Sequence, residues 1–427
     1  MSAALRETGE NFSARYRGLA SRLPGPPELR RRAAAWFDRH GLPDTRDESW
    51  RFTNLRPLAG LIFSRTEDRD GAAPGLLARL PPTEAPLLVL ANGRMRPDLS
   101  RLDLSRLPSG TTSVASFAAD PSFGNLSDSE TNPLSALNTM LAEDGARISV
   151  APGSDAGTLV LPHLASGNAE HPPAFHPRHQ VRLGAGARLT LIEIALGTSI
   201  YLHNPLTEIV LAEGAELLHL RLQDESAAAF HLASLHVTLG PKSRYESVVL
   251  VRGARVARSE LHAAIEGEGA RLGLHAAQML GGEQLADITT IVRHLAPGAS
   301  SRQSIRNVLT GRAHGVFQGR IAVDRIAQKT DGYQMNKALL LSEEAQINSK
   351  PELEIFADDV KCSHGATVGA LDPDQLFYLQ SRGVPKEAAQ AMLVGAFLGE
   401  MLEAIPHEWG RSLFEGAMQS WWKDRPV

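Results

Sequence analysis

The chain contains one cysteine, and a histidine stands two residues after it, in the segment Cys362-Ser363-His364. Thiolate and imidazole are both ligands that iron and iron–sulfur species accept in proteins. If this segment is a β-strand, residues i and i+2 share a face, so the two side chains point the same way. Cys362 and His364 are therefore candidate metal ligands. On spacing alone the opposite interpretation is favoured, since a lone cysteine is usually a small buried apolar residue.

Four further histidines, His163, His171, His176 and His179, fall close together in a proline-rich stretch. Imidazole is a common metal ligand. The spacing of these four residues, however, matches no common metal site. We therefore expect a loop region whose histidines lie on the surface, and the metal-binding alternative ranks second.

Other sequence motifs of catalysis are absent. The chain has no Gly-Lys dipeptide, which excludes the phosphate-binding P-loop, and no G-x-S-x-G, H-E-x-x-H or C-x-x-C motif. His407-Glu408 lacks the second histidine of a zinc-protease motif. Gly267-Glu268-Gly269 is followed by no helix-length segment, so it is not a dinucleotide-binding turn. The sequence predicts a protein without catalytic or cofactor-binding residues of its own.

Composition agrees with a globular protein of the cytoplasm. Of 427 residues, 43% are hydrophobic and 22% charged, and the formal net charge of −4 gives no general attraction to nucleic acid or anionic lipid. One cysteine excludes an internal disulfide framework. The N-terminal residues form no apolar secretory signal, and the longest apolar candidate, 391–398, is too short to cross a membrane.

The middle of the chain repeats itself. Short apolar runs alternate with turns, and each turn is rich in glycine and small residues. Taking Ala187, Ala215, Ser243, Ala270 and Ala299 as equivalent points gives spacings of 28, 28, 27 and 29 residues. Each period holds two strand-length runs and no helix, which favours a parallel β-helix over the helical solenoids. An antiparallel β-sandwich is the alternative that short strands and turns alone would also allow.

The two ends of the chain differ from this middle. Residues 1–145 mix helical and irregular patterns, with helices expected at 30–39 and 135–142. Residues 146–370 are expected to form the β-helix core, and residues 371–427 a C-terminal helical region. In that region an apolar stripe follows 3- and 4-residue steps and includes Met392, Phe397 and Met401. The stripe is expected either to cap the end of the β-helix or to face a partner protein.

Several ordered segments resemble one known family. The most specific is DVKCSHGATVG, Asp359 to Gly369, and the similarity extends from about residue 48 to residue 400. The chain is similar in these motifs to the SufB/SufD family of iron–sulfur cluster assembly proteins. Besides 359–369, the matching segments are Trp50–Leu55, Ala327–Thr330, Gln334–Lys337, Leu339–Ser342, Pro351–Ile355, Leu376–Leu379 and Ser381–Gly383.

Within the family the chain is more similar to the SufD branch. SufB members have Glu-His-Glu-Ala where this chain has Ser363-His364-Gly365-Ala366, and they carry further cysteines. Many relatives also have a cysteine in a P-x-C-x-S element at the position of Ala299. Any ligand set in this chain must therefore draw on Cys362, on histidines or on a partner subunit.

The resemblance implies a right-handed parallel β-helix core with helical ends. It also implies a non-catalytic scaffold of the SUF complex, paired with SufB through the β-helices and bound to the ATPase SufC through the C-terminal helices. Carried over by residue, His364 and Cys362 become candidate ligands of iron or a nascent, transient cluster at the SufB interface. A share in iron delivery and a homodimer of the isolated chain stay open.

Two other functions are weighed against this one. A β-helix enzyme acting on polysaccharide would need aromatic residues for sugar stacking and recurring acidic pairs. The chain is only 5% aromatic and shows no such pair at the repeat period. A cytosolic β-helix interaction module without a metal role is the other alternative.

Overall fold

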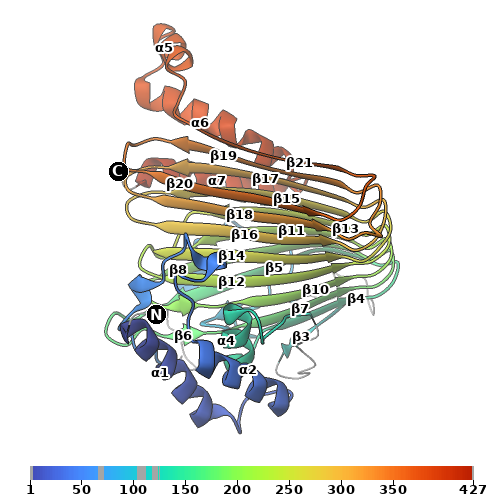
Figure 1. Cartoon of the computed structure of the whole chain (residues 1–427). Coiled ribbons are helices and arrows are strands. Elements are labelled where there is room, and N and C mark those ends of the chain that lie inside the picture. The colour runs from blue at the N-terminus through green and yellow to red at the C-terminus, as the bar shows by residue number, and fades with distance from the viewer. Residues whose placement is uncertain (1–2, 66–71, 103–111, 118–123, 125, 426–427) are drawn as a thin grey trace.

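The computed structural model describes residues 3–65, 72–102, 112–117, 124 and 126–425. Two large β-sheets face each other, and the chain passes alternately from one to the other, so that each turn contributes one strand to each sheet (Figure 1). Among the strands of the described segments nearly all neighbours are parallel, and the antiparallel pairs are β1–β2 and β3–β4. This topology confirms the parallel β-helix and rules out the antiparallel sandwich.

The strands fall into the two sheets as follows. The ten-stranded sheet contains, in spatial order, β2 (Arg94–Met95), β1 (Leu90–Ala91), β5 (Asp155–Ser166), β8 (Arg188–Thr198), β11 (Glu216–Asp224), β13 (Arg244–Val251), β15 (Arg271–Leu280), β17 (Ser300–Leu309), β19 (Asp331–Leu340) and β21 (Lys361–Gly369). The eleven-stranded sheet contains β20 (Gln346–Ile355), β18 (His314–Val323), β16 (Leu285–His294), β14 (Val256–Ile265), β12 (Phe230–Leu239), β10 (Leu206–Leu211), β7 (Arg178–Leu183), β4 (Ala146–Val150) and β3 (Thr112–Ser116). The short strand β9 (Leu202–His203) pairs with β12, and β6 (Ala174–Phe175) pairs with β9.

The sequence repeat arises at one corner of the solenoid. The residue just before each equivalent point has a positive φ, as in Gly186 (65°), Gly214 (64°) and Lys242 (54°). This left-handed conformation turns the chain from one sheet into the other, and glycine adopts it at least cost. The next residue, for example Ala187 or Ala215, is fully buried, so only a small side chain fits. The 28-residue spacing therefore records the length of one turn.

Side chains at equivalent positions stack along the inside of the solenoid. Leu189, Leu217, Tyr245 and Leu272 are register partners on four successive strands, and none is more than 3% exposed. Burying one such side chain stabilises the fold by about 1.5–3 kcal/mol. The repeated ladder of apolar contacts is the main source of stability of the core.

The N-terminal helices cover the outer face of the eleven-stranded sheet, where they share a core with Phe230, Leu232 and Val256. Trp50 and Thr53, from the motif 50–55, attach this region to the solenoid. The Arg258 guanidinium lies 4.0 Å from the centroid of the Trp50 ring, and the Thr53 hydroxyl donates a hydrogen bond to the Asp287 carboxylate.

The C-terminal helices α6 and α7 pack along the outer face of the ten-stranded sheet, against β11, β15 and β17. They do not cover the last turn of the solenoid, so of the two alternatives for this region, the one in which they cap its end is wrong. Their burial pattern also differs from the expected stripe. In α6 the fully buried residues are Ala389, Val394, Leu398 and Met401, whereas Met392 is 55% exposed.

The helices confirm the expected positions at 30–39 and 135–142. In chain order the helices are α1 (Ala3–Leu19), α2 (Pro27–His40), the 3-10 helices η1 (Glu48–Trp50) and η2 (Arg56–Leu58), α3 (Ala73–Leu77), α4 (Pro133–Leu141), α5 (Pro373–Ser381), α6 (Lys386–Glu403) and α7 (Glu408–Asp424).

Candidate functional site

The solenoid ends in an open turn. Strands β20 and β21 are the last members of their sheets, and each has a neighbouring strand on one side only (Figure 1). The N–H of Lys361 donates to the Thr330 carbonyl beside β19, at 2.8 Å. Because alternate N–H groups of a strand point to opposite edges, those of Cys362, His364, Ala366 and Val368 point away from β19. We call these four groups the outward amides of β21.

Cys362 and His364 lie on this last strand, as the sequence predicts for a strand segment. Their register partners on β19 are Gly332 and Gln334. Gln334 is fully buried inside the solenoid, and His364, at the same position one turn later, is exposed because no further turn covers it. The structure therefore places both candidate ligands on one strand at the open end. Their role as ligands stays a prediction.

The thiol of Cys362 is half-buried and packs against an apolar cluster that includes Ile321 and Val323. Burial raises the pKa of this thiol. The free thiol is therefore protonated at neutral pH. To act as a ligand it would have to release this proton when the metal binds.

The same end of the molecule exposes large apolar side chains. Ile326 is 67% exposed, Phe356 65% and Val368 56%. Soluble proteins normally protect the edge strands of a sheet, because an open edge beside apolar side chains pairs readily with another chain. The open turn therefore has the features of a surface that binds another protein through strand pairing.

A second apolar surface lies on the C-terminal helices. Helix α5 projects beyond the solenoid (Figure 1). It exposes Phe377 (72%) and Tyr378 (58%), and α6 exposes Met392. Helix α5 has no buried residue of its own. We refer to these three exposed side chains together as the α5–α6 patch.

The expectation of surface-loop histidines at 163–179 is wrong for three of the four. His163 lies in β5, His179 lies in β7, and both of them and His176 are at most 6% exposed; only His171 is exposed. Burial lowers the pKa of His176 to about 3 and that of His179 to about 4. These side chains are neutral at physiological pH and belong to the protein interior.

The structure also brings together three residues that sequence reasoning missed: His203, Glu225 and His231, all buried. A signal was present, because His203 and His231 are 28 residues apart, which is the repeat period. They are register partners on β9 and β12. Glu225 follows the end of β11 and has no periodic signal.

Comparison of the sequence with known proteins identifies one family model and several relatives that match half or more of this chain. Residues 164–397 match the family model described as SUF system FeS cluster assembly, SufBD core domain. An iron–sulfur cluster assembly SufBD family protein of Synechocystis is 32% identical over 390 residues, which cover 86% of this chain and 84% of the relative. The iron–sulfur cluster assembly protein SufD of Escherichia coli is 32% identical over 383 residues, 87% of each chain. A SufBD family protein of Mycobacterium tuberculosis is 27% identical over 398 residues, 91% of this chain and 92% of the relative.

The described helices include none that is both long and apolar enough to cross a membrane.

Three findings lead to the same conclusion about the family. They are a core matched by the family model, relatives aligned along most of their length, and the expected β-helix with helical ends. The chain belongs to the SufB/SufD family of iron–sulfur cluster assembly proteins and is SufD-like within it.

Proposed function

We propose that the chain is a non-catalytic scaffold subunit of the SUF iron–sulfur cluster assembly complex in the cytoplasm. Its open solenoid end pairs with SufB, and its α5–α6 patch binds the ATPase SufC. The observation that carries the proposal is strand β21, because one edge strand combines unpaired outward amides with the candidate ligands Cys362 and His364. Family membership supports the same role.

Pairing through β21 is favoured over pairing through β20. The N–H of Gln346, at the start of β20, donates to the Ala313 carbonyl next to β18. By the same alternation, the backbone nitrogen of residue 351 faces the outer edge of β20. This residue is Pro351, which has no N–H to donate. A partner strand beside β20 would lose a hydrogen bond there. The outward edge of β21 contains no proline.

Partner binding at β21 would also complete the candidate ligand set. An imidazole from His364 and a thiolate from Cys362 supply two ligands, and an iron site needs more. A SufB strand alongside β21 would bring its own side chains next to these two. In this arrangement iron or a nascent cluster forms between the subunits as cargo, and ATP hydrolysis occurs on SufC.

The test is a matched pair of proline variants, each co-expressed with SufB. Ala366→Pro removes an outward amide and leaves the hydrogen bonds to β19 intact, so the chain should fold normally and fail to co-elute with SufB. Thr367→Pro removes an N–H directed toward β19 and should instead lower the melting temperature of the chain itself. Normal co-elution of folded Ala366→Pro with SufB would contradict pairing through β21.

A further inference from the structure

Part of the solenoid interior is polar. Between β5 and β12 the inward positions carry five buried histidines and a glutamate, with a second glutamate just after β11, whereas the buried polar residues of the later turns include uncharged amides such as Gln303 and Gln334. Neighbouring rings are in contact, with centroids 5.0 Å apart for His163–His179 and for His203–His231. These residues are His163, His179, Glu193, His203, His219, Glu225 and His231. Burying polar side chains such as these costs free energy unless they form hydrogen bonds or ion pairs with polar partners.

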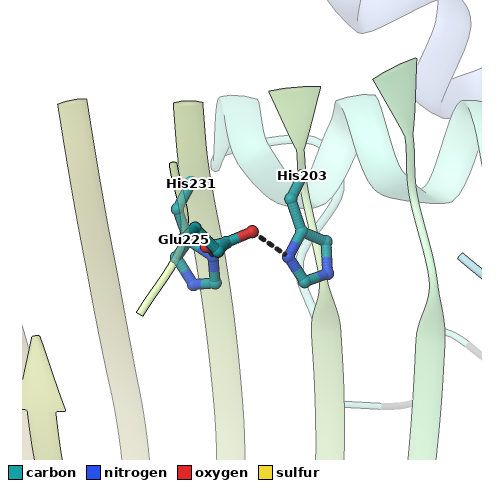
Figure 2. A group of neighbouring side chains, drawn as sticks. All are labelled: His203, Glu225 and His231. Atoms are coloured by element: carbon teal, nitrogen blue, oxygen red, sulfur yellow. Dashed lines mark hydrogen bonds and ion pairs between the residues drawn. The ribbon is translucent and has the colours of Figure 1, made fainter. Parts of the chain in front are cut away.

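At the centre of this stretch Glu225 lies between two imidazoles, as Figure 2 shows. His203 Nδ1 donates a hydrogen bond to Glu225 Oε1 at 3.0 Å. His231 Nδ1 lies 2.6 Å from Glu225 Oε2 but without the geometry of a hydrogen bond. A carboxylate oxygen and one nitrogen of each ring all lie within 4.8 Å of one another.

The charge of Glu225 is not balanced by a permanent cation. Its carboxylate has no exposed surface, and among the described residues its ion-pair contacts are with His203 and His231, not with lysine or arginine. A fully buried carboxylate without a lysine or arginine partner is an environment that a cation would stabilise.

The cluster also has a ring nitrogen without a hydrogen bond, and a cavity lies next to it. Within the described part of the chain, His203 Nε2 is buried without a hydrogen-bond partner. A cavity of about 50 Å³ adjoins the cluster and is lined by His203, His231, His163, His219 and Glu193. This volume can hold several water molecules, which a metal ion with three protein ligands would need to complete its coordination.

A second layer of hydrogen bonds holds the carboxylate in place. Gln223 Nε2 donates to Glu225 Oε2 at 3.0 Å, and Gln223 Oε1 accepts from the Gly253 N–H at 3.0 Å. Supporting contacts of this type orient the ligands in metal sites.

We propose that His203, Glu225 and His231 bind one divalent first-row transition-metal ion of the zinc(II)/iron(II) class. Two imidazoles and one carboxylate are a ligand set used for both metals, whereas magnesium and calcium prefer oxygen ligands only. Metal–ligand bonds of about 2.1 Å place tetrahedral ligand atoms roughly 3.4 Å apart, so small side-chain rotations would close the site. The site lies inside the solenoid and depends neither on Cys362 and His364 nor on SufB.

The first experiment uses the full chain with Cys362→Ser and His364→Ala, so that the open end contributes no ligands. The protein is treated with a chelator and titrated anaerobically with Co²⁺. We expect one equivalent to bind with visible d–d absorption and a higher melting temperature. Zn²⁺ should displace Co²⁺, Fe²⁺ should compete only in excess, and Mg²⁺ should not compete.

Three variants in the same background locate the ion. Glu225→Gln keeps the size of the side chain but should abolish the Co²⁺ spectrum. Gln223→Leu should weaken binding about 10- to 100-fold, because it removes a supporting hydrogen bond. His294→Gln changes another buried interior histidine, which is hydrogen-bonded to Ser301 instead of a carboxylate, and should leave binding unchanged.

Two results would overturn the proposal. One is the absence of stoichiometric Co²⁺, Zn²⁺ and Fe²⁺ binding by the folded parent protein, which decides the matter even if Glu225→Gln does not fold. The other is an unchanged Co²⁺ spectrum in folded Glu225→Gln. Neither result bears on pairing with SufB, which is measured by co-elution.

Discussion

The position of His364 gives this side chain two different properties. It follows the buried Gln334 in register, yet it is exposed because the solenoid ends there. A histidine that served only the fold would be expected to have buried hydrogen-bond partners, whereas an exposed imidazole on an edge strand keeps a lone pair available to a metal. This difference separates a ligand from a structural residue.

We expect His364→Ala to prevent cluster assembly while leaving the complex with SufB and SufC intact. Cys362→Ser should cause a milder loss if the thiol is a neighbour of the site and not a ligand. The measurement is anaerobic reconstitution with iron and sulfide, followed by absorbance, with size-exclusion chromatography of the same sample. A structural histidine would instead destabilise the fold or interface by about 1–3 kcal/mol. A wild-type cluster yield from the His364→Ala complex would rule out the ligand role.

The buried histidines make the stability of the fold dependent on pH. Burial lowers the pKa of His294 to about 4, compared with about 6.5 in an unfolded chain. Between these values the unfolded state binds a proton that the folded state does not. The contribution of His294 to the free energy of unfolding is therefore complete above about pH 6.5 and is lost as the pH falls toward 4. At about pH 5 the loss is about 2 kcal/mol.

His294→Gln tests this dependence. Between about pH 7 and about pH 5, the free energy of unfolding of the variant should fall by about 2 kcal/mol less than that of the wild type. Urea unfolding at the two pH values measures it. Equal decreases in both proteins would show that His294 is not kept neutral by burial.

Some candidate site residues could be named from sequence and others could not. Cys362 and His364 were named because they stand in the segment that resembles the family motif, and strand periodicity places i and i+2 on one face. His163, His176 and His179 were not, because nearby prolines suggested a loop and a polar residue inside a solenoid has no composition signal of its own. The pair His203 and His231 had the repeat spacing, but Glu225, outside any strand, had no periodicity that could be followed.

Among the structural elements, the corner turns determine the solenoid. Gly214 has a φ of +64°, and a Cβ added there would meet only atoms of Gly186 at 3.9 Å. Gly214→Ala should therefore lower the free energy of unfolding by about 1–2 kcal/mol through backbone strain alone, without a steric clash.

The matched control is Gly416→Ala. Gly416 lies within α7, and a Cβ there meets nothing within 4 Å. Because alanine has the higher helix propensity, this variant should raise the free energy of unfolding by about 0.5–1 kcal/mol. Chemical denaturation of both variants measures the two effects, and equal effects of the same sign would contradict the assignment of the corner.

Helix α6 shows where helical periodicity stops being informative. The 3- and 4-residue steps correctly predicted a helix with an apolar face, but not which apolar residues contact the sheet. Leu398 and Val394 do so, Phe397 is half-buried with the Arg306 guanidinium 5.1 Å from its ring centroid, and Met392 is left exposed. Tertiary packing determines which side of the apolar face contacts the sheet, and the sequence of the helix alone does not specify it.

The α5–α6 patch can be tested through Met392. Met392→Glu should fold normally and lose co-purification with SufC, because the charge is placed on the exposed patch. Leu398→Glu should instead destabilise the chain by several kcal/mol, since it buries a charge against the sheet. Pull-down with SufC and thermal unfolding of both variants separate the two effects. Full SufC binding by Met392→Glu would contradict docking at this patch.

For the whole molecule, the two ends of the solenoid differ in how they are covered. The N-terminal helices pack over the outer face near the first turns, while the last turn exposes strand edges and apolar side chains. Sequence alone predicted the repeat and the helical ends because both follow from local periodicity. The absence of a cap over β20 and β21 was not predictable, since it depends on where α6 and α7 pack in three dimensions.

Hydrogen exchange of β21 in the free chain and in the SufB-bound chain tests the central claim most directly. Amides directed toward β19 are already hydrogen-bonded in the free chain, so they should exchange slowly in both states. The outward amides of Cys362, His364, Ala366 and Val368 should exchange rapidly in the free chain and become protected when SufB binds. If SufB binds and these four amides continue to exchange at the rate of the free chain, pairing through the open end of the solenoid is wrong.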